Sequence, residues 1–244
     1  MENLGPLLGS GNVADVHAFG TLALKLYKSA NAKVSAFREA ANLAIVQELK
    51  FPTPKVHQVG LYFERWGIAM DRAPDAIDDE PAGGPERRLD ARSMAELHAS
   101  LHECSGSGLP SLKERLSSKI AQVDKITPLT KMRLVERLET LPAGDRVCHG
   151  DFHPWNVIGS GSCRVIVDWL DACSGHPTAD VCRSYLLLHS KFPDAAEQYL
   201  SAYCRLACLE RELVMRWLPV LAAARLTEQV PNEEKTLVLL AQIE

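Results

Sequence analysis

Alternating apolar and polar positions in the first part of the chain predict a small antiparallel sheet. Two β-rich runs lie on either side of a turn at Phe19-Gly20, which is typical of a hairpin. A helix is predicted over residues 32–49, where apolar side chains recur at helical spacing until the prolines of Phe51–Pro54 end it. The predicted strands are residues 13–16, 21–27, 56–63 and 66–70.

Helical periodicity dominates the second part of the chain. Ser93 and Glu96 have the spacing of a capping box, which predicts that the first of these helices opens there. One stretch, residues 147–175, lacks the helical period and contains a polar loop, a hairpin-like turn at 159–162 and an apolar strand at 164–167. The predicted helices are residues 94–103, 111–123, 128–140, 178–190, 193–208, 210–227 and 232–243.

Residues 72–90 separate these two parts and have the composition of a linker, rich in proline, glycine and charged side chains. We therefore expect an N-terminal lobe over residues 1–71, a hinge and linker over 72–90, and a helical C-terminal lobe over 91–244. The fold class is predicted to be α+β: a small antiparallel sheet with one helix, followed by a larger, mainly helical lobe, with a cleft between them.

Composition and charge narrow the classes of function. The 244 residues carry a formal charge of −4 without a basic block, which argues against a nucleic-acid partner. Seven cysteines at irregular spacings predict reduced thiols rather than a disulfide framework. The first ten residues lack a signal-peptide pattern, and the longest apolar run is too short to span a bilayer. We expect a cytoplasmic protein without membrane contact; the oligomeric state is left open.

Three oxygen-bearing side chains stand out in the non-helical stretch. Asp151 and Asn156 lie in its polar loop, and Asp168 follows its apolar strand. Magnesium in proteins prefers oxygen ligands and is usually held by one or two side chains plus substrate phosphates. Asn156 and Asp168 can supply such oxygens, and Asp151 can face an acceptor hydroxyl.

This pattern resembles the aminoglycoside phosphotransferase and choline kinase family, which is distantly related to protein kinases. The matching loop reads His149-Gly-Asp-Phe-His-Pro-Trp-Asn156, and the later strand ends in Asp168-Trp. The resemblance implies a bilobal protein-kinase-like fold and transfer of the γ-phosphoryl group of ATP to a hydroxyl of a small molecule. It also implies that Asp151 is catalytic and that Asn156 and Asp168 bind Mg²⁺.

The N-terminal part contains further matches to this family. Gly9-Ser10-Gly11 resembles the glycine-rich loop of kinases, where backbone amides approach phosphates because side chains are absent. Lys25, in an alternating strand, is similar to the lysine that contacts phosphates in the family. Glu39 on the following helix is the expected ion-pair partner of Lys25, with Glu48 as the rival.

Five further residues are assigned roles through the resemblance. Asp71 and Ala73 match the hinge, where backbone C=O and N–H groups bind adenine in the family. Asp180, near a predicted helix start, matches an aspartate that bonds the catalytic loop. Asp171 and Glu228 are the candidates for the acceptor pocket. Because the net charge is only mildly negative, we expect a neutral or singly cationic acceptor.

Other classes of site and function fit the sequence less well. Cys148, His149, His153 and Cys163 could suggest zinc, but Cys-x-x-Cys spacing is missing. A serine hydrolase would need a Gly-x-Ser-x-Gly elbow, which the sequence lacks. The alternative from another class is a catalytically silent nucleotide-binding module that acts through partners. The joint presence of lysine, aspartates and asparagine at these positions argues against it.

Overall fold

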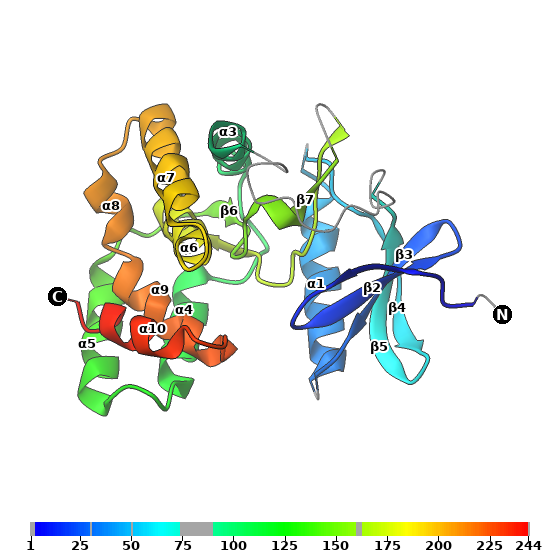
Figure 1. Cartoon of the computed structure of the whole chain (residues 1–244), viewed down its shortest axis with the longest axis horizontal. Coiled ribbons are helices and arrows are strands. Elements are labelled where there is room, and N and C mark those ends of the chain that lie inside the picture. The colour runs from blue at the N-terminus through cyan, green and yellow to red at the C-terminus, as the bar shows by residue number, and fades with distance from the viewer. Residues whose placement is uncertain (1–2, 30, 50, 74–89, 160–162, 244) are drawn as a thin grey trace. The chain divides into compact units, whose positions relative to one another are not determined.

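The computed structural model describes residues 3–29, 31–49, 51–73, 90–159 and 163–243, which form two compact units. The first contains the described residues of Met1–Gly83 together with Trp155–Asp171, and the second those of Gly84–Pro154 together with Ala172–Glu244 (Figure 1). Trp155–Asp171, expected with the helical lobe, thus packs with the first unit. Most of the expected linker and of the turn at 159–162 lies outside the described residues. The predicted lobe boundaries stay a prediction.

The first unit is built on a five-stranded antiparallel sheet with strand order β1-β2-β3-β5-β4. Gly20 has a φ of +57° in the two-residue turn that joins β2 to β3, a conformation that favours glycine. Leu24, Leu26 and Ala69 form a buried core cluster on β3 and β5. The strands are β1 (Leu7–Ser10), β2 (Ala14–Phe19), β3 (Leu22–Tyr27), β4 (Val56–Tyr62) and β5 (Arg65–Asp71).

The helix α1 (Ala32–Val46) packs on the sheet and contacts β3, β4 and β5 (Figure 1). A short hairpin of β7 (Val157–Ile158) and β8 (Val165–Ile166) completes the unit. Ile166 N donates to Pro52 O at 3.0 Å, which fixes the hairpin to the segment after α1. The four predicted strands and the helix of this part are present, whereas β1 was missed.

The second unit is mainly helical. Its central helix α6 is almost completely buried and packs against α7 and α9. A two-stranded antiparallel pair of β6 (Arg146–Cys148) and β9 (Cys173–Gly175) flanks the loop that follows β6. The helices are α3 (Ala91–Leu101), α4 (Leu112–Gln122), α5 (Pro128–Thr140), α6 (Pro177–His189), α7 (Pro193–Ala207), α8 (Arg211–Met215), α9 (Leu218–Arg225) and α10 (Glu234–Leu240), with a 3₁₀ turn η3 (Leu226–Glu228). The α+β prediction is confirmed.

Two helix predictions were wrong in detail. The capping box at Ser93 is not used: Asp90 caps α3, and its carboxylate accepts hydrogen bonds from Arg92 N and Ser93 N. The single helix expected over 210–227 is divided into α8 and α9. Pro219 explains the break, because it has no N–H to donate to the carbonyl of Met215 one turn earlier.

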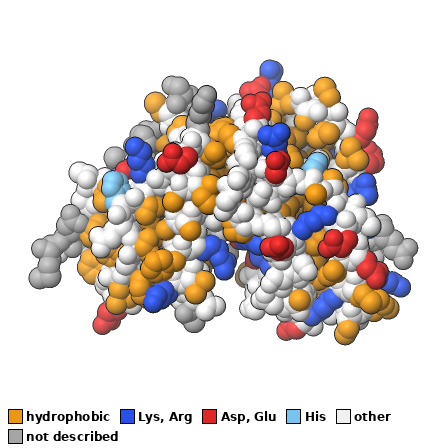
Figure 2. Space-filling view, turned by 180° about the vertical axis from the view of Figure 1, so that it is seen from behind, with side chains coloured by type: hydrophobic (Ala, Val, Ile, Leu, Met, Phe, Trp, Pro, Cys, Tyr) orange, Lys and Arg blue, Asp and Glu red, His pale blue; other side chains and the backbone are white. Residues whose placement is uncertain are grey.

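The surface carries charges of both signs. Figure 2 shows basic and acidic side chains interspersed with hydrophobic ones over one face of the molecule. No helix among the described residues is long and apolar enough to cross a bilayer. The absence of a nucleic-acid partner stays a prediction from the sequence.

Candidate functional site

Lys25 is the centre of a buried ion cluster in the first unit. Its Nζ lies 2.8 Å from Glu39 Oε2 and 2.8 Å from Asp168 Oδ1. The Lys25 and Glu39 side chains are buried, whereas that of Asp168 is 41% exposed. The Tyr27 hydroxyl donates a hydrogen bond to Glu39. The predicted ion pair of Lys25 with Glu39 is therefore present, and Glu48 is not the partner.

The environment keeps Lys25 charged. Burial alone would lower the pKa of this lysine, but the carboxylates of Asp168 and Glu39 raise its pKa above the usual value. A charged ammonium group beside an accessible carboxylate can exchange one anionic partner for another. This property is what a phosphate-contacting lysine requires.

Asn156 and Asp168 are brought together by the backbone. Val167 N donates to Asn156 O at 2.9 Å, so the residue before Asp168 is bonded to Asn156. Asp168 has a φ of +65°, which is uncommon for a residue other than glycine and costs about 1–3 kcal/mol. Asn42 on α1 helps to hold this turn by donating from Nδ2 to Trp169 O at 2.9 Å. Both proposed metal ligands thus occupy neighbouring positions in the first unit.

The glycine-rich segment spans the end of β1 and the turn into β2. A side-chain carbon added to Gly9 would meet nothing within 4 Å, and one added to Gly11 would meet only Ala14 O at 3.8 Å. Neither glycine has a positive φ. Packing among the described residues therefore does not require glycine at these positions. Ser10 Oγ donates to Asp15 Oδ1 at 2.8 Å, which braces the turn.

Asp71 and Ala73, the predicted hinge residues, lie at and just beyond the end of β5. Asp71 N donates to Lys55 O at 2.9 Å, and the Asp71 carboxylate binds His57 Nε2 at 2.7 Å. The Asp71 side chain is thus engaged within the chain, which agrees with a role for its backbone carbonyl alone. Ala73 is buried. Their contact with a nucleotide stays a prediction.

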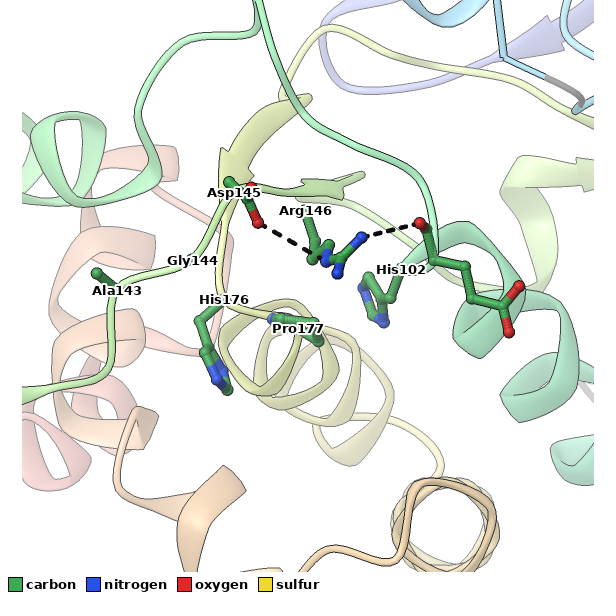
Figure 3. A pocket seen from close by; sticks show the side chains of 8 residues that line it. His102, Ala143, Gly144, Asp145, Arg146, His176 and Pro177 are labelled. Carbon is green, nitrogen blue, oxygen red and sulfur yellow. Dashed lines mark hydrogen bonds and ion pairs between the residues drawn. The ribbon is translucent and has the colours of Figure 1, made fainter.

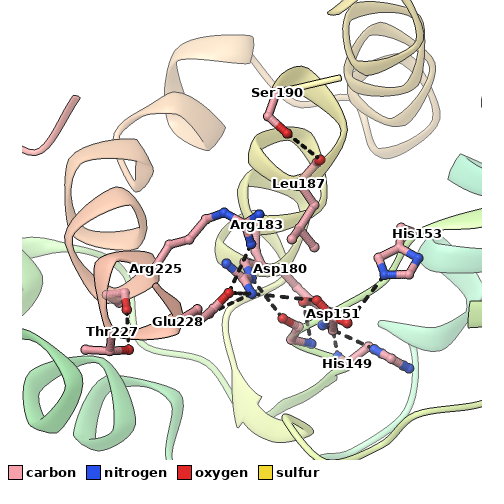
Figure 4. A network of polar contacts seen from close by, with 12 residues as sticks. His149, Asp151, His153, Asp180, Arg183, Leu187, Ser190, Arg225, Thr227 and Glu228 are labelled. Carbon is pink, nitrogen blue, oxygen red and sulfur yellow. Dashed lines mark hydrogen bonds and ion pairs between the residues drawn. The ribbon is translucent and has the colours of Figure 1, made fainter. Parts of the chain in front are cut away.

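Asp151 belongs to the second unit, in the loop after β6. Its Oδ1 lies 3.6 Å from Arg183 and its Oδ2 lies 3.4 Å from His153 Nε2 (Figure 4). Burial would raise the pKa of the Asp151 carboxyl, but the hydrogen bond and charge of His153 and the charge of Arg183 hold it below the usual range. Asp151 is therefore ionised, as a proton acceptor must be.

Asp180, at the start of α6, fixes the backbone of this loop. It accepts hydrogen bonds from His149 N at 2.6 Å and from Gly150 N at 2.8 Å. On its other side it contacts the buried imidazoles of His98 and His102, at 2.9 and 3.3 Å. The structural role expected for Asp180 is confirmed.

The two histidines extend this network to α7. His98 Nδ1 lies 2.6 Å from the Tyr199 hydroxyl, and His102 Nδ1 lies 2.7 Å from the Tyr203 hydroxyl. Burial, with the neighbouring His102, lowers the pKa of His98 to about 3. Sequence reasoning missed these residues; the i, i+4 spacing of the two histidines on a predicted helix was the available signal.

His98, His102 and Asp180 are also close enough to hold a metal ion. The Nδ1 atoms of both histidines are already engaged by the two tyrosines, and their Nε2 atoms by Asp180. Both carboxylate oxygens of Asp180 accept from the loop backbone. The four residues considered as zinc ligands from the sequence do not form such a group within the described part of the chain.

A shallow pocket of about 520 Å³ lies at the other end of β6 (Figure 3). Gly144 and Asp145 precede β6, whereas Asp151 follows it. His102, and His176 and Pro177 at the start of α6, also contribute to the lining. The pocket is thus separated from Asp151 by the length of the strand.

Comparison with known proteins gives a match to a family model. The family model described as "Phosphotransferase enzyme family" matches residues 8–218. Among curated proteins, none matches the sequence.

Solved structures show the same protein-kinase-like fold. An aminoglycoside-3'-phosphotransferase of type VIII aligns with a TM-score of 0.62 at 22% identity, over 92% of this chain and 93% of that chain. A protein assigned as a fructosamine-3-kinase, from Haemophilus somnus 129PT, aligns with a TM-score of 0.66 at 13% identity, over 98% and 90%. The streptomycin–ATP–APH(2")-IIa ternary complex aligns with a TM-score of 0.57 at 16% identity, over 100% and 92%.

Proposed function

Because this chain belongs to the phosphotransferase enzyme family, we propose that it transfers the γ-phosphoryl group of ATP to a hydroxyl of a small molecule. The observation that supports this most strongly is the buried Lys25, paired with Glu39 and with the accessible carboxylate of Asp168. A lysine of this kind can contact nucleotide phosphates while Glu39 keeps its side chain in place.

The glycine-rich segment supplies the second argument for a nucleotide. Gly9 and Gly11 leave open space where a side chain would project, and the fold among the described residues does not demand glycine there. Backbone amides in such a segment can approach phosphates closely. In this proposal Gly9-Ser10-Gly11 covers the phosphates of ATP, and the backbone of Asp71 and Ala73 binds adenine.

The residues present fit a magnesium ion. Asn156 offers an amide oxygen and Asp168 a carboxylate, the oxygen donors that Mg²⁺ prefers. Asp168 Oδ1 accepts from Lys25, and no partner of Oδ2 is found among the described residues. Asn156 and Asp168 would therefore hold Mg²⁺, which neutralises charge on the phosphates when it is bound.

Asp151 is proposed to accept the proton of the acceptor hydroxyl. The acceptor oxygen forms a bond to the γ-phosphorus, the bond from that phosphorus to the bridging oxygen of ADP breaks, and the hydroxyl proton passes to the Asp151 carboxylate. The low pKa of Asp151 keeps the carboxylate in its proton-accepting form. Catalysis then rests mainly on positioning and charge neutralisation, as expected for phosphoryl transfer.

For the acceptor we propose a neutral or singly cationic compound. The formal charge of −4 is a weak attraction for a polycation. A polycationic acceptor such as a kanamycin-like compound would be steered by charge, and its binding would weaken steeply as salt shortens the Debye length from about 10 Å at 0.1 M. Tight, strongly salt-dependent binding of such compounds, with phosphoryl transfer, would contradict this proposal.

Slow ADP formation from Mg²⁺-ATP with water as the acceptor tests the enzymatic proposal without a known substrate. We expect measurable ADP formation by the wild-type protein that depends on Mg²⁺. A silent nucleotide-binding module would bind Mg²⁺-ATP and release no ADP above the background of the Asp151→Asn variant.

A further inference from the structure

Asp180 and Arg183, one helical turn apart on α6, hold the peptide groups on both sides of Gly150, the residue before Asp151. Asp180 accepts from Gly150 N at 2.8 Å, and Arg183 Nε donates to Gly150 O at 3.0 Å. Residues three apart on a helix lie on the same face, which lets both side chains reach one loop residue. Gly150 has a φ of +78°, a conformation that an L side chain rarely adopts.

Arg183 also contacts the proposed base itself. Its terminal nitrogen lies 3.6 Å from Asp151 Oδ1 and donates to Glu228 Oε1 and Oε2 at 2.8 and 2.9 Å (Figure 4). The Arg183 side chain is only 9% exposed. A guanidinium group is planar and rigid, so holding this terminal nitrogen on Glu228 also holds Nε, which donates to Gly150 O.

Glu228 is engaged by three cations of the chain. In addition to Arg183, it accepts from Arg225 Nη1 at 3.0 Å and from Lys119 Nζ at 3.3 Å. These cations come from α6, α9 and α4, and Arg225 is itself held by Glu233 at 2.6 Å. Buried charges are tolerated only when they are paired, and here each cation has a carboxylate. The Glu228 carboxylate is thus engaged in ion pairs within the chain, whereas the sequence led us to expect a contact with the acceptor.

We propose that Arg183 is a positioning residue for Asp151 and that Glu228 acts through Arg183 by holding its guanidinium group. The inference rests on the proposed function, in which Asp151 receives the proton. Contacts that begin on α4 and α9 and continue through Glu228 and Arg183 thus set the position of the Asp151 carboxylate. A Glu228 that bound the acceptor would instead change the KM for the acceptor and leave the reaction with water untouched.

The test uses the whole 244-residue chain and needs no acceptor. The variants are Arg183→Lys, Glu228→Gln and the double variant, with Arg211→Lys and Glu197→Gln as matched controls. Arg211 and Glu197 form a similar two-bonded ion pair on α8 and α7, without a described contact to the loop of Asp151. The measurements are kcat and KM for ATP in ADP formation with water, and the melting temperature of each variant.

Arg183→Lys should lower kcat by about 10²-fold, because it keeps the charge but loses the fixed fork that holds Gly150 and Asp151. Glu228→Gln should also lower kcat, and the KM for ATP should be unchanged in both single variants. The kcat of the double variant should be only slightly lower than that of the more impaired single variant, since both substitutions act through one contact. The control pair should keep the wild-type kcat.

Amide hydrogen exchange at residues 149–151 gives a readout that does not depend on turnover. We expect faster exchange there in Arg183→Lys and Glu228→Gln than in the control variants. If the wild-type protein forms no ADP, the proposed function fails, and the exchange rates still decide the positioning role. Unchanged exchange at 149–151, or in an active enzyme a wild-type kcat for Glu228→Gln, would overturn the inference. If Arg183→Lys does not fold, Glu228→Gln carries the test alone.

Discussion

Lys25 and Arg183 are two buried cations with opposite surroundings. Lys25 has two carboxylates to itself, Glu39 and Asp168, and the second of these is 41% exposed. Arg183 shares the carboxylate of Glu228 with two further cations, and it is nearly inaccessible to solvent. One cluster has a carboxylate in excess, whereas in the other the cations and carboxylates balance once Asp151 and Glu233 are included.

This difference separates two kinds of task. A cluster with an excess, accessible carboxylate can take up a divalent cation and let its lysine turn to a phosphate. A charge-balanced and mostly buried cluster has no excess charge to attract an ion and instead fixes the elements that supply its charges. We therefore assign exchange of partners to the site around Lys25 and rigid support of Asp151 to the cluster around Arg183.

Removal of the proposed base should have the largest effect. Asp151→Asn is expected to lower turnover by roughly 10²–10⁴-fold, because general-base catalysis contributes a rate factor of this size and the amide cannot accept the proton. Nucleotide affinity should stay nearly intact, since the proposed role places this side chain at the acceptor rather than at ATP. Steady-state kinetics at saturating acceptor measures the loss, and a kcat close to wild type would remove Asp151 from the base role.

Lys25→Met should destabilise the fold, because the Lys25 cluster is held by buried charge. Loss of the cation leaves the buried Glu39 with the Tyr27 hydroxyl but no counter-charge, and breaking a buried ion pair costs about 3–5 kcal/mol. Lys125→Met is the control, because its ion pair with Glu234 is exposed and contributes about 0–1 kcal/mol. Urea unfolding measures both. Equal stability of the two variants would mean that the Lys25 cluster is not held by charge.

The two proposed metal ligands should contribute unequally to Mg²⁺-dependent nucleotide binding. Asp168→Ala is expected to weaken Mg²⁺-dependent nucleotide binding more than Asn156→Ala, because a carboxylate brings charge to the cation and an amide only a dipole. Calorimetry with a non-hydrolysable ATP analogue, with and without Mg²⁺, gives both losses. Equal losses, or losses that persist without Mg²⁺, would count against the assignment.

The support of the catalytic loop should weaken in acid. His98 is buried in its neutral form, and its pKa falls from the usual 6.5 to about 3 in the folded chain. A lowered pKa means that folding is favoured fully above pH 6.5 and that this contribution is lost as the pH falls from 6.5 towards 3. The free energy of unfolding should therefore decline over this window, and the decline should be smaller in His98→Gln. An equal decline in both proteins would exclude His98 as its source.

Local patterns of the sequence account for much of this architecture. The helix α5 was predicted at its observed bounds, because Thr127 and Pro128 mark a helix start and the apolar spacing defines its buried face. Strand β1 was missed because Leu7–Ser10 lacks alternation and overlaps the glycine-rich segment. At α3, two capping residues compete, and Asp90 rather than Ser93 makes the hydrogen bonds. Such competition is decided by tertiary packing, which the sequence pattern does not contain.

The candidate site was predictable where its residues are close in sequence or match a known motif. Asp151, Asn156 and Asp168 lie within one stretch, and the pairing of Lys25 with Glu39 follows from the resemblance to kinases. The contacts of Arg183 were not predictable, since it meets Glu228 forty-five residues later and both residues resemble ordinary surface charges in the sequence. Only the packing of α6 against α9 and the catalytic loop brings these charges together.

Transfer of a labelled γ-phosphoryl group tests the central claim most directly. The wild-type protein is incubated with Mg²⁺ and ATP that carries ¹⁸O on its γ-phosphoryl group, together with a panel of neutral and cationic hydroxyl compounds, and the products are identified by mass spectrometry. The account predicts a compound that gains one labelled phosphoryl group with the wild-type protein and not with Asp151→Asn. The account would be contradicted if the protein bound ATP but the label appeared neither in a hydroxyl compound nor in phosphate released to water.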